Sequence, residues 1–494
     1  MSEMAHSVEE NLALALCLAR EVDRKGGRAY YVGGYVRDKR MAEVSGESDM
    51  AERAVAGIRQ VDSERAESIQ AKDHESSGHI DIDLEIYGIL PEQLTEILSQ
   101  FGNIVETGIS YGVYGIEGYD LDIALPRLER AIGKGHKDFQ VTVDPFLSSR
   151  RAVERRDFTM NALLQDVLTG EIIDHKNGLL DMRDRKIRHV CEESFPEDPL
   201  RLFRAARFAA RFDYEIAEET IALCREMDVR VLAKERVFGE LKKALLQSRK
   251  PSIFFRELRK MGQLSYWFPE VEAMIGVQQG RKYHKEGDVW THTMLALDQA
   301  AACRSQVRQP LSFLLAALCH DMGKPAVTTF QKGDWHAYQH ELAGVEIAEG
   351  FVRRLSGEKQ ILAYVSNMVR LHMRPHTICF SDSSIKKSNH MFDESVEPYD
   401  LIMLAACDEK AAWKDLPHFD EEAYLVKRLA IYEEYMTRPY VMGKDLLEAG
   451  LKPGKEFSEI LAHAHKLRLA GIPKETALKQ TLAFAKRLPL ESLE

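Results

Sequence analysis

The sequence predicts an α/β head followed by an elongated all-α body. Strand-like runs of β-branched and aromatic residues alternate with helical segments in the first third of the chain. From RRDFTMNALL onward the hydrophobic spacing becomes helical, apart from a hairpin-like stretch around TGEIIDHKNG. A chain of 494 residues is also too long for one hydrophobic core, so we expect three or more units, each with its own interior.

The head elements follow one another in a recognisable order. Residues 8–25 predict an amphipathic helix that ends at Gly26-Gly27, and AYYVGGYVRD predicts a strand, a glycine break and a helix start. The polar stretch 41–78 is predicted to be a flexible or partly helical insertion. Next we expect a strand in DIDLEIYGI, a helix in PEQLTEILSQFG, a strand pair around VETGISYGVYGI and YDLDIAL, and a loop in GKGHKDF.

Composition excludes some classes of protein. A formal net charge of −11 argues against a purely electrostatic nucleic-acid binder, although local arginine clusters oppose this mean. Seven scattered cysteines without a C-x-x-C pair indicate reduced thiols in a cytoplasmic protein. The longest apolar stretch is far too short to span a bilayer, and the acidic first residues do not predict export.

The strand DIDLE carries carboxylates on one face. Side chains at i and i+2 of a strand point the same way, so Asp81, Asp83 and Glu85 share a face opposite the isoleucines. Such a face is either a solvated edge or a site for magnesium. Asp122, on a neighbouring predicted strand, would complete a metal cage, whereas Asp120 lies nearer the strand start. Magnesium ions there would suit nucleotidyl transfer.

VGGYVRD predicts a strand, two glycines and a helix onset. Gly33 and Gly34 would let backbone amides approach an anion, and the amino terminus of the helix favours negative charge. This signal is weak alone, because Gly-Gly turns are common. Its position before the carboxylate strand strengthens it.

Several ordered motifs carry a family resemblance. GGYVRD, DIDLE, RRDFTMNAL, DHKNGLLD, EDPLRLFRAARFAARF and KERVFGELKK, spread over residues 28–275, resemble the bacterial tRNA nucleotidyltransferase (CCA-adding) and poly(A) polymerase family, the class II nucleotidyltransferases. The segment between Asp38 and Asp81 is longer than is usual in that family.

The resemblance implies a set of site residues. Asp81 and Asp83 would be the catalytic magnesium ligands, to which the strand pattern adds Asp122 as the candidate third carboxylate. Gly33, Gly34 and Arg37 would hold the triphosphate. Arg156, Asp157 and Asn161 would shape the ribose and phosphate site. For Arg156 and Asp157, a structural ion pair is the alternative.

EDPLR offers a means of base selection. Asp198 and Arg201, at i and i+3 of a predicted helix face, place an acceptor beside a forked donor. Cytosine and adenine both present an amino donor next to a ring-nitrogen acceptor, whereas uracil and guanine would put a carbonyl against the carboxylate. The alternative is an intrahelical ion pair. The resemblance favours selection of CTP and ATP without a nucleic-acid template.

Arg204 and Arg207 continue the arginine row of the same predicted helix. Such a row is either a solvated face or a surface that tracks an RNA backbone. We predict that tRNA lies along the helical body with its 3′ end in the head, and that binding weakens with salt if these arginines contact phosphates.

Residues 284–410 contain a spaced His/Asp series. His320 and Asp321 directly follow an apolar helix, where an acid without a cation would be costly. The series is similar to the HD superfamily of metal-dependent phosphohydrolases, which implies a metal site at four residues and a second metal at two more, with Lys324 at a phosphate. The implied ligands are His292, His320, Asp321 and Asp408, then His340 and His372. Nickel, cobalt, manganese or iron would suit such ligands.

Together these features predict a tRNA nucleotidyltransferase that adds or repairs the terminal CCA from CTP and ATP by two-metal chemistry. A poly(A) polymerase, or an enzyme adding only CC or only A, is the alternative, and an HD phosphohydrolase with an RNA-binding head is the alternative from another class. The predicted domains are an N-terminal helix, a nucleotidyltransferase head, a neck with an RNA-binding helical body, an HD phosphohydrolase-like domain and a helical tail. Their boundaries are 1–27, 28–165 with the insertion 41–78, 166–275, 284–410 and 411–494.

Overall fold

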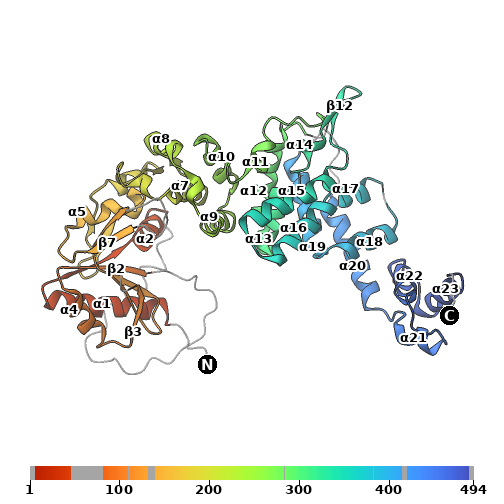
Figure 1. The fold of residues 1–494 in the computed structure, drawn as a ribbon, viewed down its shortest axis with the longest axis horizontal. Coiled ribbons are helices and arrows are strands. Elements are labelled where there is room, and N and C mark those ends of the chain that lie inside the picture. Colours follow the sequence, from red (N-terminus) through yellow and green to blue (C-terminus); the bar gives the residue numbers. More distant parts are fainter. Residues whose placement is uncertain are drawn as a thin grey trace. The chain divides into compact units, whose positions relative to one another are not determined.

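The computed structural model divides the chain into two compact units. Residues Met1–Leu232 form the first and Ala233–Glu494 the second. The structure describes residues 6–45, 82–108, 112–131, 139–282, 284–381, 383–413 and 420–488. Figure 1 shows a sheet with helices in the first unit and helices almost throughout the second.

The first unit is built on a seven-stranded mixed sheet with the order β3-β4-β5-β2-β1-β8-β9. Its strands are β1 (Arg28–Val32), β2 (Ile82–Tyr87), β3 (Ile104–Gly108), β4 (Val113–Ile116), β5 (Leu121–Ala124), β8 (Leu164–Asp166) and β9 (Ile172–Ile173). β2 runs parallel to β5 and antiparallel to β1. The central strand β2 is therefore paired on both edges, which holds its carboxylate face in a fixed register.

The helix α1 (Val8–Arg24) confirms the first predicted element. A capping box between Ser7 and Glu10 starts it, and the chain turns back at Gly26, where φ is +84°. Its apolar face, including Leu18 and Val22, is buried and lies beside β1 and α4 (Pro91–Leu98). α2 (Gly34–Ser45) follows β1 directly and packs against β1 and β2.

The remaining elements of the first unit are short, except for the helices after residue 199. β6 (Arg127–Ala131) and β7 (Phe139–Val143) form a separate hairpin, and β8 and β9 form the hairpin expected around TGEIIDHKNG. α5 (Ser149–Ala152), α6 (Gly178–Arg183) and the parallel pair β10 (Lys186–Ile187) and β11 (Glu215–Ile216) complete the connections. α7 (Leu200–Phe212) and α8 (Glu218–Glu226) begin the helical part of the chain.

The second unit is helical apart from the hairpin of β12 (Thr329–Gln331) and β13 (Asp334–His336). α13 (Pro310–Cys319) is its most apolar helix, with Phe313 to Cys319 all buried, and it packs against α12, α16 and α19. The helices up to α19 are α9 (Lys234–Gln247), α10 (Ser252–Lys260), α11 (Pro269–Ala273), α12 (Val289–Cys303), α13, α14 (Lys324–Val327), α15 (His340–Leu355), α16 (Lys359–Leu371), α17 (Met373–Phe380), α18 (Ile385–Glu394) and α19 (Pro398–Ala411).

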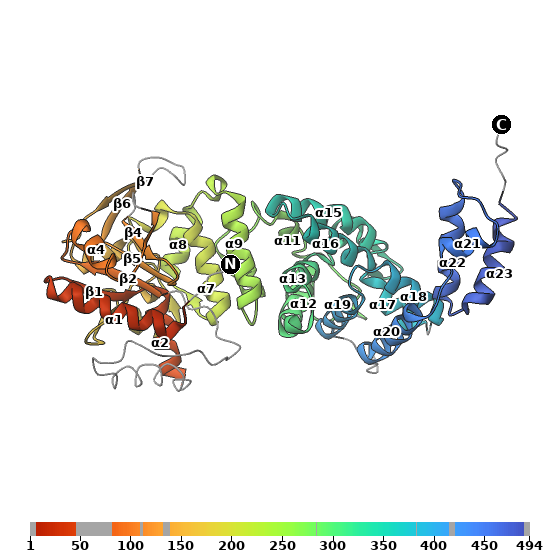
Figure 2. The same ribbon diagram turned by 90° about the horizontal axis from the view of Figure 1, so that it is seen from below.

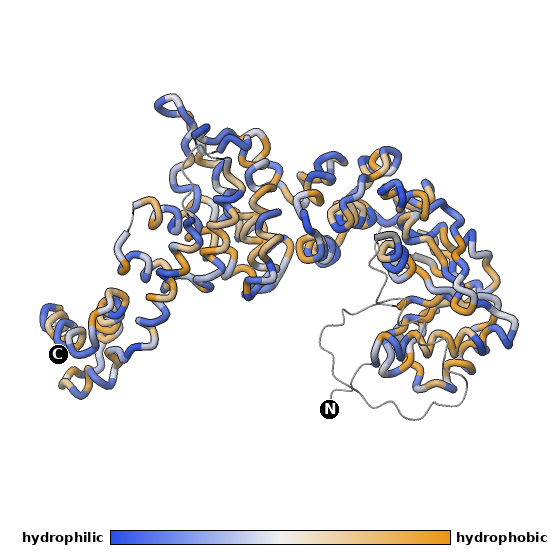
Figure 3. The backbone as a smooth tube through the Cα atoms, turned by 180° about the vertical axis from the view of Figure 1, so that it is seen from behind, coloured by the Kyte–Doolittle hydropathy of each residue, from blue (hydrophilic) through white to orange (hydrophobic). Residues whose placement is uncertain are grey.

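α20 (Glu421–Thr437) packs mainly against α17, α18 and α19. The last three helices, α21 (Gly443–Glu448), α22 (Phe457–Leu469) and α23 (Lys474–Ala485), form a small cluster with its own core. Val441, Leu446, Ile460 and Ala464 are buried between α21, α22 and α23, which Figure 2 shows side by side. Hydrophobic and hydrophilic residues alternate along many of the helices (Figure 3), as expected of helices that bury one apolar face.

The observed architecture confirms the predicted fold class of an α/β head followed by a helical body. Residues 41–45 continue α2, while the rest of the predicted insertion lies outside the described residues, as does most of the loop GKGHKDF. Among the helices that the structure describes, none combines the length and apolar character needed to cross a membrane. The division into five domains stays a prediction.

Candidate functional sites

The carboxylate face of β2 lies next to an acid of β5. The register pairs Asp83 with Asp122 on the parallel neighbour, so both carboxylates project from the same face. Asp120 precedes β5, as expected. Asp81 lies just outside the described residues, and its role stays a prediction. Side-by-side carboxylate oxygens are the donors that magnesium prefers, so Asp83 and Asp122 fit a magnesium site.

Glu85 has a role that the sequence did not indicate. Its carboxylate is buried, accepts a hydrogen bond from Arg155 at 2.7 Å and from the Tyr87 hydroxyl at 2.8 Å, and lies 3.7 Å from Arg156. Burial alone would raise the pKa of Glu85, but the charges of Arg156 and Arg155 hold it below its usual value. Glu85 therefore anchors the two arginines of RRDF beside the metal face.

The glycine turn after β1 approaches this face closely. Gly33 has φ of +69°, and a Cβ atom there would lie 3.1 Å from Asp83 Oδ2 and 3.5 Å from Arg156 Nη1. Gly34 begins α2, whose amino terminus therefore follows the turn. The predicted juxtaposition of glycine turn and carboxylate strand is thus present in the fold.

The side chain of Arg37 is buried, whereas a surface ligand of phosphate would be exposed to solvent. It is buried in α2, donates to Asn161 Oδ1 at 2.7 Å and to Asp38 at 2.7 Å, and stacks at 5.0 Å on the rings of Phe208 and Phe212. These contacts join α2 to Asn161 and to α7. Its predicted contact with a triphosphate stays a prediction.

Asp157 forms the ion pair that was the structural alternative for this residue. Arg204 Nε donates to Asp157 Oδ2 at 2.7 Å, and Asn161 Nδ2 donates to Oδ1 at 2.9 Å. Burial would raise the pKa of Asp157, but Arg204 and the hydrogen bonds lower it to about 2. Arg37, Asn161, Asp157 and Arg204 therefore form one connected network between α2 and α7.

The expectation that Asp198 and Arg201 share a helix face is wrong for Asp198. α7 starts at Leu200, and Asp198 has an extended conformation before it, with Oδ1 accepting from the Leu200 amide. Pro199 fixes this entry into the helix. Arg201 lies in the first turn and donates to the carbonyls of Ser194 and Arg155.

Arg207 is buried, and its guanidinium lies 3.8 Å from the ring centre of Phe208. Little of this side chain is left for RNA contact. Arg204, engaged with Asp157, is about one-third exposed. Regular i, i+3 spacing predicted one arginine face, but the fold turns much of that face inward.

The predicted HD residues converge in the second unit. His320 and Asp321 directly follow α13, and His292 of α12 lies 3.7 Å from Asp321 Oδ2 and 2.8 Å from Asp408 Oδ1. Burial would raise the pKa of Asp321, but Lys324, at 2.7 Å, and His320 hold it well below its usual value. The buried Nε2 of His320 lies 3.3 Å from Asp321 Oδ2, so the two atoms could bind the same ion.

His340 and His372 lie on the other oxygen of Asp321. His340 Nε2 is 3.2 Å and His372 Nε2 3.9 Å from Asp321 Oδ1, and the two Nε2 atoms are 3.1 Å apart. Each Nδ1 is held by a backbone carbonyl, of Ala337 and Val369 respectively. Asp321 thus lies between two groups that could each hold a metal ion.

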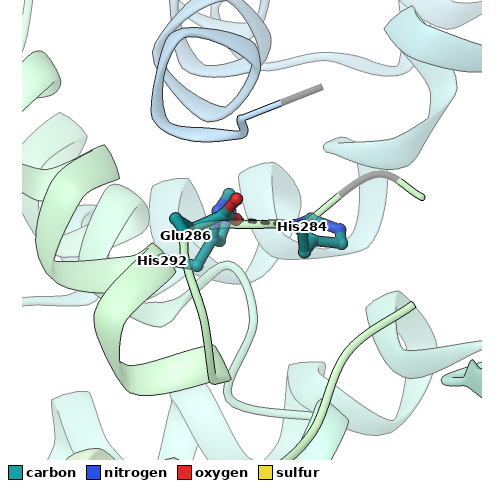
Figure 4. Close-up of side chains that lie close together, drawn as sticks. All are labelled: His284, Glu286 and His292. Atoms are coloured by element: carbon teal, nitrogen blue, oxygen red, sulfur yellow. Dashed lines mark hydrogen bonds and ion pairs between the residues drawn. The ribbon is translucent and has the colours of Figure 1, made fainter. Parts of the chain in front are cut away.

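Three further residues at this cluster were not predicted. Glu286 contacts both His284 and His292, as Figure 4 shows, and His376 contacts Asp408 Oδ2 at 3.1 Å. His284, Glu286 and His376 lie within the motifs HKEGDVWTH and LHMRPH. Only their position within these motifs could have suggested them.

Comparisons with known proteins agree with this geometry. Residues 29–188 match the poly A polymerase head domain. The chain carries this head domain. Residues 213–275 match a probable RNA and SrmB-binding site of polymerase A, and residues 289–412 match the HD domain. These matches confirm the resemblance predicted from the sequence, and both domain types generally use divalent metal ions.

One curated relative is the multifunctional CCA protein of Haemophilus ducreyi, 36% identical over 269 residues. The aligned part is 53% of this chain and 64% of that protein, so the chain matches less than two thirds of the relative's length. Over about half of its length the chain is therefore similar to a protein named for CCA.

Solved structures share the fold over nearly the whole chain. The Thermotoga maritima CCA-adding enzyme complexed with tRNA has a TM-score of 0.58 at 18% identity, covering 98% of this chain and 99% of that one. The Bacillus stearothermophilus CCA-adding enzyme in complex with CTP has a TM-score of 0.59 at 18% identity, covering 96% and 98%. A CCA-adding enzyme complexed with ATP has a TM-score of 0.62 at 16% identity, covering 98% and 96%. The chain therefore has the fold of CCA-adding enzymes.

Proposed function

We propose that the protein is a tRNA nucleotidyltransferase that adds or repairs the 3′-terminal CCA of tRNA from CTP and ATP, releasing pyrophosphate. The observation that carries this proposal is the register of Asp83 with Asp122 on parallel strands beside the Gly33 turn. The similarity to a multifunctional CCA protein and to CCA-adding enzymes supports it over a poly(A) polymerase.

Different residues of the head would bind the metal ions and the triphosphate in this reaction. Asp83, Asp122 and the predicted Asp81 would hold magnesium, which supplies activation of the attacking hydroxyl and neutralisation of the leaving pyrophosphate. Because Gly33 has no side chain beside Asp83 and Arg156, its backbone leaves the amino terminus of α2 accessible to a triphosphate. Arg156, anchored by Glu85, adds positive charge beside this turn.

Base selection rests on Asp198 and Arg201 in this proposal. Two backbone carbonyls fix the guanidinium of Arg201, which makes it a preorganised donor. Asp198 offers an acceptor for the amino group that cytosine and adenine share. The same pair would therefore accept both bases in turn without a template.

The helical body would carry the tRNA. α9, which lies within the match to an RNA-binding region, exposes Lys242 and Lys243. Exposed lysines can neutralise phosphates, which the buried Arg207 is poorly placed to do. The seven free cysteines support a cytoplasmic location.

The test is extension of a tRNA transcript that ends at the discriminator base. With magnesium, CTP alone should add two cytidines, and a terminal adenosine should follow only when CTP and ATP are both present. Asp83→Asn should abolish both additions. A long adenosine ladder from ATP alone would establish a poly(A) polymerase, and a stop after CC or an A-only product would establish a partial enzyme.

The His/Asp cluster favours a second activity, a metal-dependent phosphohydrolase or phosphodiesterase in the HD domain. His292, His320, Asp321 and Asp408 would hold nickel, cobalt, manganese or iron, and His340 and His372 would serve a second ion. Such an ion supplies an activated water, and Lys324 would neutralise the phosphate. Asp321→Asn should abolish hydrolysis of bis(p-nitrophenyl) phosphate and leave CCA addition unchanged; parental hydrolysis in this variant would refute the assignment.

A further inference from the structure

Glu286 is a buried carboxylate at the edge of the HD cluster. It lies in the loop before α12, and its side chain is 0% exposed. Its Oε1 is 2.8 Å from Nδ1 of His284 and 2.8 Å from Nδ1 of His292 (Figure 4). Its Oε2 accepts a hydrogen bond from the Trp413 amide at 2.9 Å. A buried acid with three such partners is held in one place.

The contact with His292 determines which nitrogen faces the metal cluster. A carboxylate accepts hydrogen bonds, so the Nδ1–H of His292 donates to Glu286 and the lone pair of neutral imidazole resides on Nε2. Nε2 is the atom that lies 2.8 Å from Asp408 Oδ1 and 3.7 Å from Asp321 Oδ2. Glu286 therefore sets both the tautomer and the ring orientation of His292.

The contact with Trp413 connects Glu286 to the end of α19, the helix that carries the proposed metal ligand Asp408. Trp413 follows α19, the helix that carries Asp408, while His292 belongs to α12. One carboxylate thus ties together the loop before α12, the ring of His292 and the end of α19. This tie adds to the direct packing of α12 against α19, the helices that carry His292 and Asp408.

We propose that Glu286 is a positioning residue of the HD-domain metal site, which orients His292 and fixes α12 against the end of α19 so that a divalent cation is bound tightly. This inference rests on the proposed metal-binding role of the HD domain. An outer carboxylate of this kind also raises the basicity of the imidazole that it holds, and its loss typically weakens metal binding by about 10- to 100-fold.

The test is titration of the metal-free full chain with Mn²⁺, following free Mn²⁺ by electron paramagnetic resonance. Asp321→Asn defines which bound Mn²⁺ belongs to the HD cluster, since the head can bind the ion too. For that site, Glu286→Gln should raise the dissociation constant about 10-fold or more. The control is Glu422→Gln, the same change at a partly exposed carboxylate 3.0 Å from Lys410, which should leave the constant unchanged.

A second variant guards against loss of folding. Glu286→Asp keeps the charge but is one methylene shorter, so it should raise the constant several-fold in protein whose circular dichroism matches the parent. Equal Mn²⁺ affinity in the parent and in either folded Glu286 variant would overturn the positioning role of Glu286 but not the HD metal site. No difference between parent and Asp321→Asn in bound Mn²⁺ would overturn the HD metal site and the inference together.

Discussion

Replacing Gly33 by alanine tests whether the glycine turn must lie against the catalytic face. Gly33 has φ of +69°, so a side chain there costs roughly 1–2 kcal/mol of backbone strain. The new Cβ would also lie 3.1 Å from Asp83 Oδ2, a few tenths of an ångström closer than an ordinary contact. The carboxylate must move, because the glycine lies at the end of a strand paired directly with β2.

Gly262 provides a matched control. Its φ of +67° is nearly the same, but nothing lies within 4 Å of a Cβ atom built there. Gly262→Ala therefore introduces the same strain without displacing a neighbour. Both variants should lose a similar free energy of unfolding, measured by urea titration.

Only Gly33→Ala should lose activity. A misplacement of about 1 Å at a reacting group costs on the order of 100-fold in rate, so a smaller shift of Asp83 should cost about 10-fold or more. Single-turnover addition of CMP to a tRNA transcript measures this loss without product release. Equal rates for Gly33→Ala and Gly262→Ala would refute the close packing of the turn against Asp83.

Three further changes test the head. Glu85→Gln leaves two arginines without their buried counter-ion and should lower the free energy of unfolding by about 3 kcal/mol in urea titration; a loss under about 1 kcal/mol would contradict the anchoring role. The pKa of Asp157 is lowered to about 2 in the fold, so its ionised form adds roughly 2.5 kcal/mol of stability above pH 4 that is lost as the pH falls towards 2. The stability gap between parent and Asp157→Asn should therefore shrink by about half between pH 5 and pH 3, and a constant gap would refute the shift. Asp198→Ala should relax nucleotide choice more than it lowers turnover, and unchanged incorporation of UTP and GTP relative to CTP and ATP would remove its role in base selection.

Local spacing alone predicted much of the head. Alternation along DIDLE placed Asp83 on a face, and the choice of Asp122 over Asp120 followed from its place within a strand. Side-chain direction repeats every two residues in a strand, so the face of Asp83 follows without knowing which strands pair with β2. The same holds for α1, whose apolar period and caps are local.

Spacing alone did not predict which side chains of α7 share a face or which of its arginines are exposed. Spacing in EDPLRLFRAARF predicted one polar face, yet Asp198 lies before the helix and Arg207 is buried against Phe208. A proline shifts the start of a helix by a residue or two, and that is enough to change which side chains share a face. Whether a guanidinium meets solvent or an aromatic ring depends on what packs over it.

By itself the sequence determined most of the helices and the central strands, the carboxylate face and the glycine turn, because each is written in neighbouring residues. The HD ligands, which are far apart in the chain, were indicated by the family resemblance of their motifs. Tertiary structure alone decided that Glu85 holds Arg155 and that Asp157 holds Arg204. It also decided that Glu286 joins His292 to the end of α19. In all but one case these partners are 47 to 127 residues apart in the sequence. A buried charge is stable only beside an opposite charge or a hydrogen-bond partner, and only the folded chain brings such distant residues together.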